Sequence, residues 1–115
     1  MQPSPNADPP RIEVAVAFPV YHTYTYTVPE QMQGLVCAGK RVLVPFGRRQ
    51  ITGYVLGADS REQEVENLKP VSDVLDETPI FPEEMIPFFR WVADYYIHPI
   101  GDVICDALPG GINPA

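Results

Sequence analysis

The sequence predicts an α+β fold that is mainly β, a small barrel-like antiparallel sheet followed by a C-terminal helical pair. Across about residues 11–76, apolar and polar residues alternate in short runs separated by Pro and Gly. This period of two is typical of strands. Across about residues 80–109, apolar residues recur every three or four positions, which is the spacing of one helical face. A chain of 115 residues has room for one domain with one modest core.

Two alternating runs predict the first two strands. Residues 11–18 place four apolar side chains on one face, and residues 23–28 alternate threonines with Tyr24 and Tyr26. β-Branched and aromatic residues favour strands. Tyr26, in the middle of its strand, is predicted to lie in the core, whereas Tyr24, near the strand entry, is either a core residue or a stacking platform. Residues 29–33 are expected to form a turn or a single helical turn.

Residues 39–57 predict a hairpin of two short strands. Pro45 is expected to end the pairing of the first strand because it has no N–H to donate. Gly47 can adopt backbone angles that other residues avoid, so the turn is placed there. Ile51–Leu56 is the predicted returning strand, in which Gly53 indicates a bulge or a close approach by another group.

The tip of this hairpin is basic. Arg48 and Arg49 directly follow Gly47, so two cations and a bare glycine backbone are expected on one exposed loop. Such a tip suits an anionic or extended ligand. The alternative is a solvated hairpin whose charges serve solubility, and these residues alone leave both interpretations open.

The C-terminal third predicts two helices. Residues 82–84 suit a first helical turn, and Pro87 would cost a hydrogen bond beyond that turn, so the regular helix is expected to start a few residues later. It should end by His98, which precedes a proline. Gly101–Asp102 is interpreted as a break and an N-cap, with a second helix over 103–108. The apolar face predicted for the first helix consists of Ile86, Phe89, Val92, Ala93 and Tyr96.

The segments around these elements set the expected domain boundaries. Residues 1–10 are predicted to be a disordered lead-in, residues 11–109 the folded domain, and residues 110–115 the start of a linker. Within the domain, 58–66 is expected to be a mobile acidic loop and 69–75 a short strand. The sequence has no apolar run of the roughly 20 residues that span a bilayer and no signal peptide, so a cytosolic protein without a membrane partner is expected.

The net charge of −7 argues against a general nucleic-acid binder, which usually has a basic face. Its distribution is uneven, because residues 1–58 carry five basic and three acidic side chains, whereas 59–115 carry three and twelve. Half of the eight basic residues lie within Lys40–Arg49. An anion therefore has one obvious place to bind.

The sequence offers no catalytic or metal-binding set. It lacks a GxxxxGK[ST] phosphate loop, an HExxH motif and a nucleophile–base pair. Two cysteines, Cys37 and Cys105, and two separated histidines do not form a zinc-ligand pattern, and both thiols are predicted to be buried and reduced. We expect a binding module without a cofactor of its own, and not an enzyme.

Four stretches together resemble the N-terminal domain of the PriA family, the primosomal replication-restart DNA helicases of bacteria. The resemblance covers about residues 11–109. Its motifs are specific in combination and weak singly. They are Tyr24-Thr-Tyr-Thr-Val-Pro29, Gly39-Lys-Arg-Val-Leu-Val-Pro-Phe-Gly47 with Gly53 following, Leu68-Lys69, and Trp91-Val-Ala-Asp-Tyr-Tyr96 leading to Pro99-Ile-Gly-Asp102 and Ala107-Leu-Pro109.

The resemblance implies capture of the 3′ end of the nascent leading strand at stalled forks. The parent's ATP-hydrolysing helicase lobes and zinc-binding region would lie outside these residues. Implied partners are single-stranded or forked DNA, those helicase lobes, other primosome proteins and single-strand binding protein. The family pocket maps onto Tyr24 with Thr25, Gly47 and Lys69, and the preceding phosphates would meet Arg48 and Arg49.

One pocket position departs from the family. Some members have Asp beside the aromatic residue, and this chain has Thr25. A threonine hydroxyl donates and accepts, whereas an aspartate only accepts, so hydrogen bonding to the base would differ while stacking on Tyr24 would not. A second class of function also remains open, a small β-barrel protein-interaction module whose acidic half docks a basic partner or the parent's helicase lobes.

Overall fold

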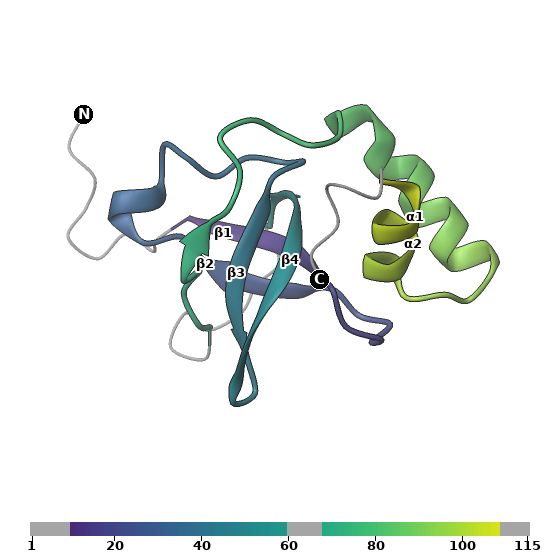
Figure 1. The fold of residues 1–115 in the computed structure, drawn as a ribbon, viewed down its shortest axis with the longest axis horizontal. Coiled ribbons are helices and arrows are strands. Elements are labelled where there is room, and N and C mark those ends of the chain that lie inside the picture. Colours follow the sequence, from purple (N-terminus) through teal and green to yellow (C-terminus); the bar gives the residue numbers. More distant parts are fainter. Residues whose placement is uncertain (1–9, 60–67, 109–115) are drawn as a thin grey trace.

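The computed structural model describes residues 10–59 and 68–108, which form an antiparallel sheet with a helical pair packed at one end (Figure 1). The mainly β, α+β prediction is confirmed. The sheet has the strand order β2-β1-β4-β3-β5. Its strands are β1 (Arg11–Val16), β2 (Tyr24–Thr27), β3 (Arg41–Phe46), β4 (Arg49–Ala58) and β5 (Asp73–Val74).

In the part of the chain that the structure describes, the two edges of this sheet meet at one point only. The Thr27 N–H donates to the Lys69 carbonyl at 3.0 Å, and the Val71 N–H donates to the Thr27 carbonyl at 2.9 Å. Thr27 and Pro70 form an isolated parallel bridge between the β2 edge and the chain that enters β5. The sheet therefore curls without closing, and it is a barrel only in a loose sense.

The inner face of the curled sheet holds the first hydrophobic core. Alternate residues of each strand point into it, as the period of two predicts. Tyr26 is buried there, as expected, and Tyr24 is half-buried against it. The aliphatic centre of this core consists of Val14, Val16, Val42, Val44, Val55 and Val71.

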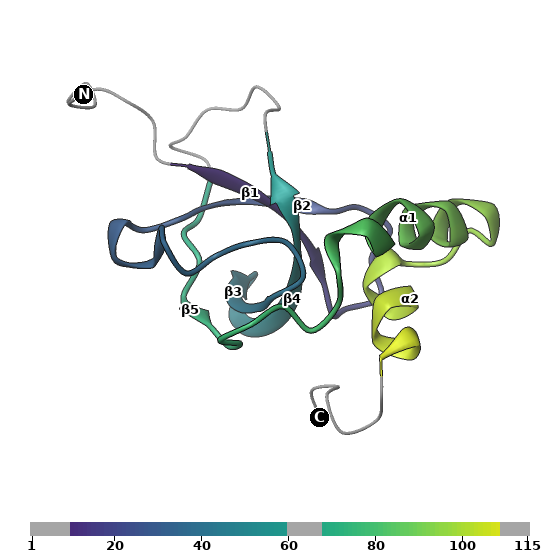
Figure 2. The same ribbon diagram turned by 90° about the horizontal axis from the view of Figure 1, so that it is seen from above.

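A second core lies between the outer face of the sheet and the helices, which lie together at one end of the molecule (Figure 2). Tyr54 and Leu56 of β4 face this core, while Val55 between them faces the first. A Cβ atom on Gly101 would lie 2.0 Å from the Val16 carbonyl oxygen. Only glycine therefore allows the second helix to approach β1 so closely. The helical contribution to this core includes Ile86, Phe89, Ile100, Ile104 and Leu108.

Two predictions for the hairpin meet different outcomes. Pairing continues through Pro45, which lies opposite Gln50, so the prediction that Pro45 ends the strand was wrong. In a hairpin with a two-residue turn, the residue pair next to the turn exchanges backbone hydrogen bonds and the following pair does not. Pro45 and Gln50 form that following pair, so the missing N–H of Pro45 costs no hydrogen bond to β4. Gly53 is a site of close approach, because a Cβ there would lie 2.3 Å from Val14 Cγ1. The register shift lies elsewhere, between Glu13 and Val14.

The strands and turns follow the predicted order with shifted ends. The turn predicted for residues 29–33 is a 3₁₀ helix, η1 (Glu30–Met32). β1 ends before Phe18, and β4 extends beyond Ile51–Leu56 at both ends. The strand predicted for 69–75 is confined to β5 and the Pro70 bridge.

The helical region begins with the 3₁₀ helix η3 (Glu83–Met85), followed by α1 (Ile86–Tyr95) and α2 (Ile100–Ala107). Pro87 lies in the first turn of α1, as expected. The break predicted at Gly101–Asp102 was wrong, because α2 starts earlier and includes both residues. Tyr96 was also wrongly included in the apolar face of the first helix, since α1 ends before it and its side chain is exposed.

The end of α1 has an unusual residue in its cap. The His98 N–H donates to the Ala93 carbonyl at 2.8 Å and the Ile97 N–H to the Asp94 carbonyl at 3.4 Å, which is the pattern of a Schellman motif. Ile97 occupies the left-handed position with φ of 50°. Glycine normally fills this position, and a β-branched side chain there is strained.

Two further expectations concern boundaries and thiols. The lead-in over 1–10, most of the acidic loop over 58–66 and the exit from residue 109 onward fall largely outside the described residues.

The prediction of two buried thiols was wrong, because Cys37 is exposed and Cys105 is only partly buried.

Candidate nucleic-acid interface

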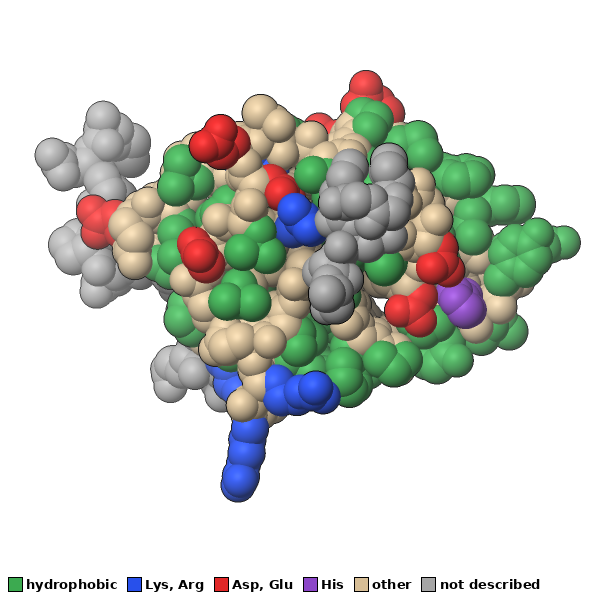
Figure 3. Space-filling model, in the orientation of Figure 1, with side chains coloured by type: hydrophobic (Ala, Val, Ile, Leu, Met, Phe, Trp, Pro, Cys, Tyr) green, Lys and Arg blue, Asp and Glu red, His purple; other side chains and the backbone are tan. Residues whose placement is uncertain are grey.

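The β3–β4 hairpin carries the candidate site at its tip. Gly47 has φ of 61°, the positive value that a II′-type hairpin turn requires at its first central position. Arg48 and Arg49 follow it and both are exposed. Figure 3 shows basic side chains gathered at this projecting end of the hairpin.

The other two cations of the Lys40–Arg49 segment have structural roles. Lys40 is buried, and its Nζ donates to the Leu35 carbonyl at 2.7 Å. Arg41 holds Asp76 through its backbone N–H and its Nη2, each at 2.8 Å. Burial opposes ionisation of Asp76, but the hydrogen bonds from Arg41 outweigh it and hold the pKa of this carboxyl below its usual value. The apparent basic cluster of the sequence is therefore reduced to the two arginines at the tip.

An aromatic cluster adjoins the basic tip. The ring of Phe46, the residue before Gly47, lies 5.4 Å from the Phe18 ring and 5.2 Å from the Tyr24 ring between centroids. The Arg49 guanidinium carbon lies 5.8 Å from the centre of the Phe18 ring, within range of a cation–π interaction. Sequence reasoning missed Phe18 and Phe46, although the position of Phe46 directly before the turn glycine was an available signal.

Tyr26 fixes the strand that carries Tyr24. Its hydroxyl donates to the Pro45 carbonyl at 2.9 Å across the interior of the curled sheet. Burial, and secondarily the neighbouring Tyr24, raises the pKa of Tyr26 to about 12. The hydroxyl is therefore a donor at every pH at which the protein would be used, and β2 is tied to the hairpin near its tip.

Thr25 and Lys69 lie differently from Tyr24. The Thr25 hydroxyl donates to the carboxylate of Asp59, which follows β4. Successive strand residues point to opposite faces, so this side chain is directed away from the face that carries Tyr24. Lys69 is exposed, and its carbonyl is bonded to β2 at Thr27.

The structure thus brings Tyr24, Gly47 and Arg49 together through the aromatic cluster. The backbone of Lys69 is hydrogen-bonded to β2, the strand that carries Tyr24. The Thr25 side chain lies on the face of the sheet opposite to Tyr24. Within residues 10–59 and 68–108, no group of three His, Cys, Asp or Glu side chains could hold a metal ion. Neither of the α-helices in that part of the chain is long and apolar enough to cross a membrane.

Comparison with known proteins places the chain in a family. Residues 13–109 match the family described as the 3′ DNA-binding domain (3′BD) of PriA. The chain is 33% identical over 99 residues to the replication restart protein PriA of Haemophilus influenzae, covering 85% of this chain and 13% of that protein. It is 35% identical over 72 residues to PriA of Bacillus subtilis, covering 62% of this chain and 9% of that one.

A third relative agrees with these two. PriA of Synechocystis is 34% identical over 92 residues, covering 77% of this chain and 11% of the relative. The chain therefore spans about a tenth of the length of these curated relatives. Since the family match extends over most of its residues, this chain belongs to the 3′ DNA-binding domain family of PriA.

Proposed function

We propose that this domain binds the 3′ end of single-stranded DNA and, within a longer bacterial replication-restart protein, captures the nascent leading-strand end at stalled forks. The observation that carries the proposal is the family match over residues 13–109. The geometry supports it, because a half-buried tyrosine adjoins an exposed tip with two arginines. The family assignment favours this function over that of a general protein-interaction module.

Stacking and charge would supply the binding free energy. A terminal base stacked on Tyr24 gains about 1–3 kcal/mol, with little dependence on which base it is. Arg48 and Arg49 would neutralise the preceding phosphates. A footprint of one base and two phosphates is compatible with a chain of net charge −7.

Gly47 would let the terminal sugar approach the backbone. The positive φ of the turn accounts for a glycine there, and an added Cβ would have no neighbour within 4 Å, so the backbone of the tip is open to a ligand. A terminal nucleotide has a free 3′-hydroxyl and no onward phosphate. A pocket closed on that side would reject a continuing strand sterically, and it would read an end without reading a sequence.

Lys69 and Thr25 complete the proposed pocket in different ways. Lys69 would contact the terminal sugar or base from the segment that bridges to β2. Thr25 would contribute mainly through its backbone, because its hydroxyl is engaged by Asp59. Stacking on Tyr24 does not depend on Thr25, so end binding would persist without a hydrogen bond from this side chain.

The wider setting follows from the same family. We expect the domain to act in the bacterial cytoplasm without a cofactor of its own. ATP and zinc would be bound by other parts of the longer protein. Its helicase lobes, other primosome proteins and single-strand binding protein are further proposed partners.

Fluorescence anisotropy with short oligonucleotides tests the end-binding proposal. A strand with a free 3′-hydroxyl should bind more tightly than the same strand with a 3′-phosphate, and blocking the 5′ end should have no effect. Equal affinity for the two 3′ ends, or no binding to either, would refute 3′-end recognition.

A further inference from the structure

The outer face of α1 exposes a continuous set of large apolar side chains, here called the aromatic face. The Phe88 and Trp91 rings lie 6.5 Å apart and the Trp91 and Tyr95 rings 5.2 Å apart, both nearly parallel. Figure 3 shows hydrophobic side chains gathered at this end of the molecule. The aromatic face consists of Phe88, Trp91, Tyr95, Tyr96 and Ile97, each between 53% and 77% exposed.

The packing among residues 10–59 and 68–108 does not use this face. The opposite side of α1 supplies Ile86 and Phe89 to the core shared with β4 and α2. A surface helix ordinarily has one apolar face and one polar face, whereas α1 has a second apolar face in solvent. Contiguous exposed apolar residues of this size mark interaction sites on soluble proteins.

Ile97 gives independent support for a functional face. It lies in the left-handed region at φ of 50° and is 77% exposed. A β-branched residue there costs stability, and its side chain gains nothing from burial. Strained residues of this kind cluster at functional positions.

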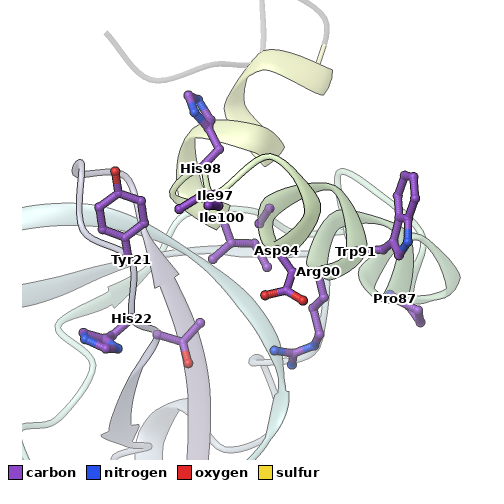
Figure 4. Close-up of a pocket in the computed structure, with 11 residues that line it drawn as sticks. Tyr21, His22, Pro87, Arg90, Trp91, Asp94, Ile97, His98 and Ile100 are labelled. Carbon is purple, nitrogen blue, oxygen red and sulfur yellow. The ribbon is translucent and has the colours of Figure 1, made fainter.

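An open groove of about 1080 Å³ borders the aromatic face. In Figure 4, Tyr21 and His22 lie on one side of it, and Arg90 and Asp94 of α1 lie on the other. The Arg90 guanidinium is held by Glu13 through two hydrogen bonds of 3.0 and 2.7 Å. The groove therefore presents aromatic rings and a carboxylate, with its arginine already engaged within the domain.

Charge narrows the kind of partner. Residues 77–108 carry six carboxylates and a single basic side chain, Arg90. A nucleic acid would meet repulsion here, since phosphate contacts dominate its affinity. A protein surface with apolar side chains and a basic rim would meet complementary charge.

We propose that the aromatic face and its groove dock onto the remaining part of the longer protein to which this domain belongs. The relatives described above are about ten times longer than the matched region, and 87% to 91% of their length lies outside it. A covalently attached partner is present at high effective concentration, so a face of modest area suffices to hold it. The proposal does not depend on DNA binding, because no residue of the aromatic face or of the groove lining is among the proposed DNA contacts.

The single tryptophan of the chain, Trp91, reports directly on docking. Domain 1–115 labelled with 5-fluorotryptophan gives a single ¹⁹F resonance, which is titrated with the unlabelled remainder of the longer protein. We expect the resonance to shift and broaden on binding. Phe88→Ser with Tyr95→Ser should weaken the complex about tenfold or more, and added salt should weaken it further.

Leu35→Ser is the matched control, because Leu35 is 52% exposed and closely follows η1 in the sequence. The segment that contains η1 lies at the end of the molecule away from α1 (Figure 1). This control should bind like the parent domain, and all variants should retain 3′-end binding if they fold. A Trp91 resonance that is unchanged by the remainder at saturating concentration would overturn the proposal. A shift that depends only on the concentration of the domain itself would also overturn it, in favour of self-association.

Discussion

Removing the two arginines at the hairpin tip is expected to weaken DNA binding mainly through the loss of phosphate contacts. Arg48→Ala with Arg49→Ala deletes the exposed cations beside Gly47 and leaves Lys40 and Arg41 in their structural roles. The affinity for every oligonucleotide that reaches the preceding phosphates should fall. The preference for a 3′-hydroxyl over a 3′-phosphate should remain.

The magnitude follows from counterion release. Each phosphate contact on single-stranded DNA contributes about 0.7 to the slope of log affinity against log salt concentration. The double variant should therefore lose about 1.4 from that slope if both arginines bind phosphates. Arg49 lies over the Phe18 ring, so its single variant should lose further affinity through disturbed packing beside Tyr24. Arg48→Ala should lose only the affinity and the slope that belong to its phosphate contact.

The assay is anisotropy at several salt concentrations, with Arg90→Gln as the charge-matched control for each single variant. Arg90 is paired with Glu13 on the helical side, so its removal changes net charge equally without touching the hairpin. A control that loses as much slope as Arg48→Ala would show that net charge, and not the tip, sets the affinity. An unchanged slope in the double variant would mean that these arginines are only solvated charges.

Four further predictions concern single residues. Tyr24→Ala should weaken 3′-end binding by about 1–3 kcal/mol with little preference among bases, and a thermal melt must accompany the titration because Tyr24 also packs on Phe46; unchanged affinity would remove it from the site. Lys69→Ala should erode the preference for a free 3′-hydroxyl while the salt slope persists; unaltered discrimination would indicate a surface charge only. Ile97→Gly should raise the free energy of unfolding by about 0.5–1 kcal/mol, because glycine adopts the left-handed conformation without strain. Urea denaturation measures this change, and a lower stability of the variant would argue against strain at Ile97. Pairing with Arg41 lowers the pKa of Asp76. The stabilising contribution of this carboxylate is therefore complete above about pH 4 and is lost as the pH falls through its folded pKa. Plots of the free energy of unfolding against pH for the parent and for Asp76→Asn should converge in acid.

The sequence predicted the elements whose pattern is local. Alternation over residues 11–16 and 24–27 marks strands because one face carries large apolar side chains into the inner core, while the other carries polar or small residues. Gly53 indicated a close approach because its missing side chain is a local signal, and the structure shows that Val14 fills that space. The same reasoning correctly placed Tyr26 in the core.

The errors arose where a distant partner decides the outcome. Gly101 looked like a helix break, but it is glycine because the Val16 carbonyl lies against it. Lys40 and Arg41 looked like part of an anion site, but Leu35 and Asp76 engage them. Within the candidate site, the contact of Thr25 with Asp59 joins residues 34 positions apart, and no local pattern could reveal it.

The strand β4 couples the two ends of the domain. It begins at Arg49 on the hairpin tip, and its residues contribute alternately to the core inside the sheet and to the core under the helices. Neither core can be lost without exposing one face of this strand. The domain should therefore unfold as one cooperative unit, without a separately melting helical part. Hydrogen exchange would then give the amides of β4 the slowest rates, equal on its two faces, and loosening α2 would shorten the lifetime of the folded hairpin that presents Arg48 and Arg49.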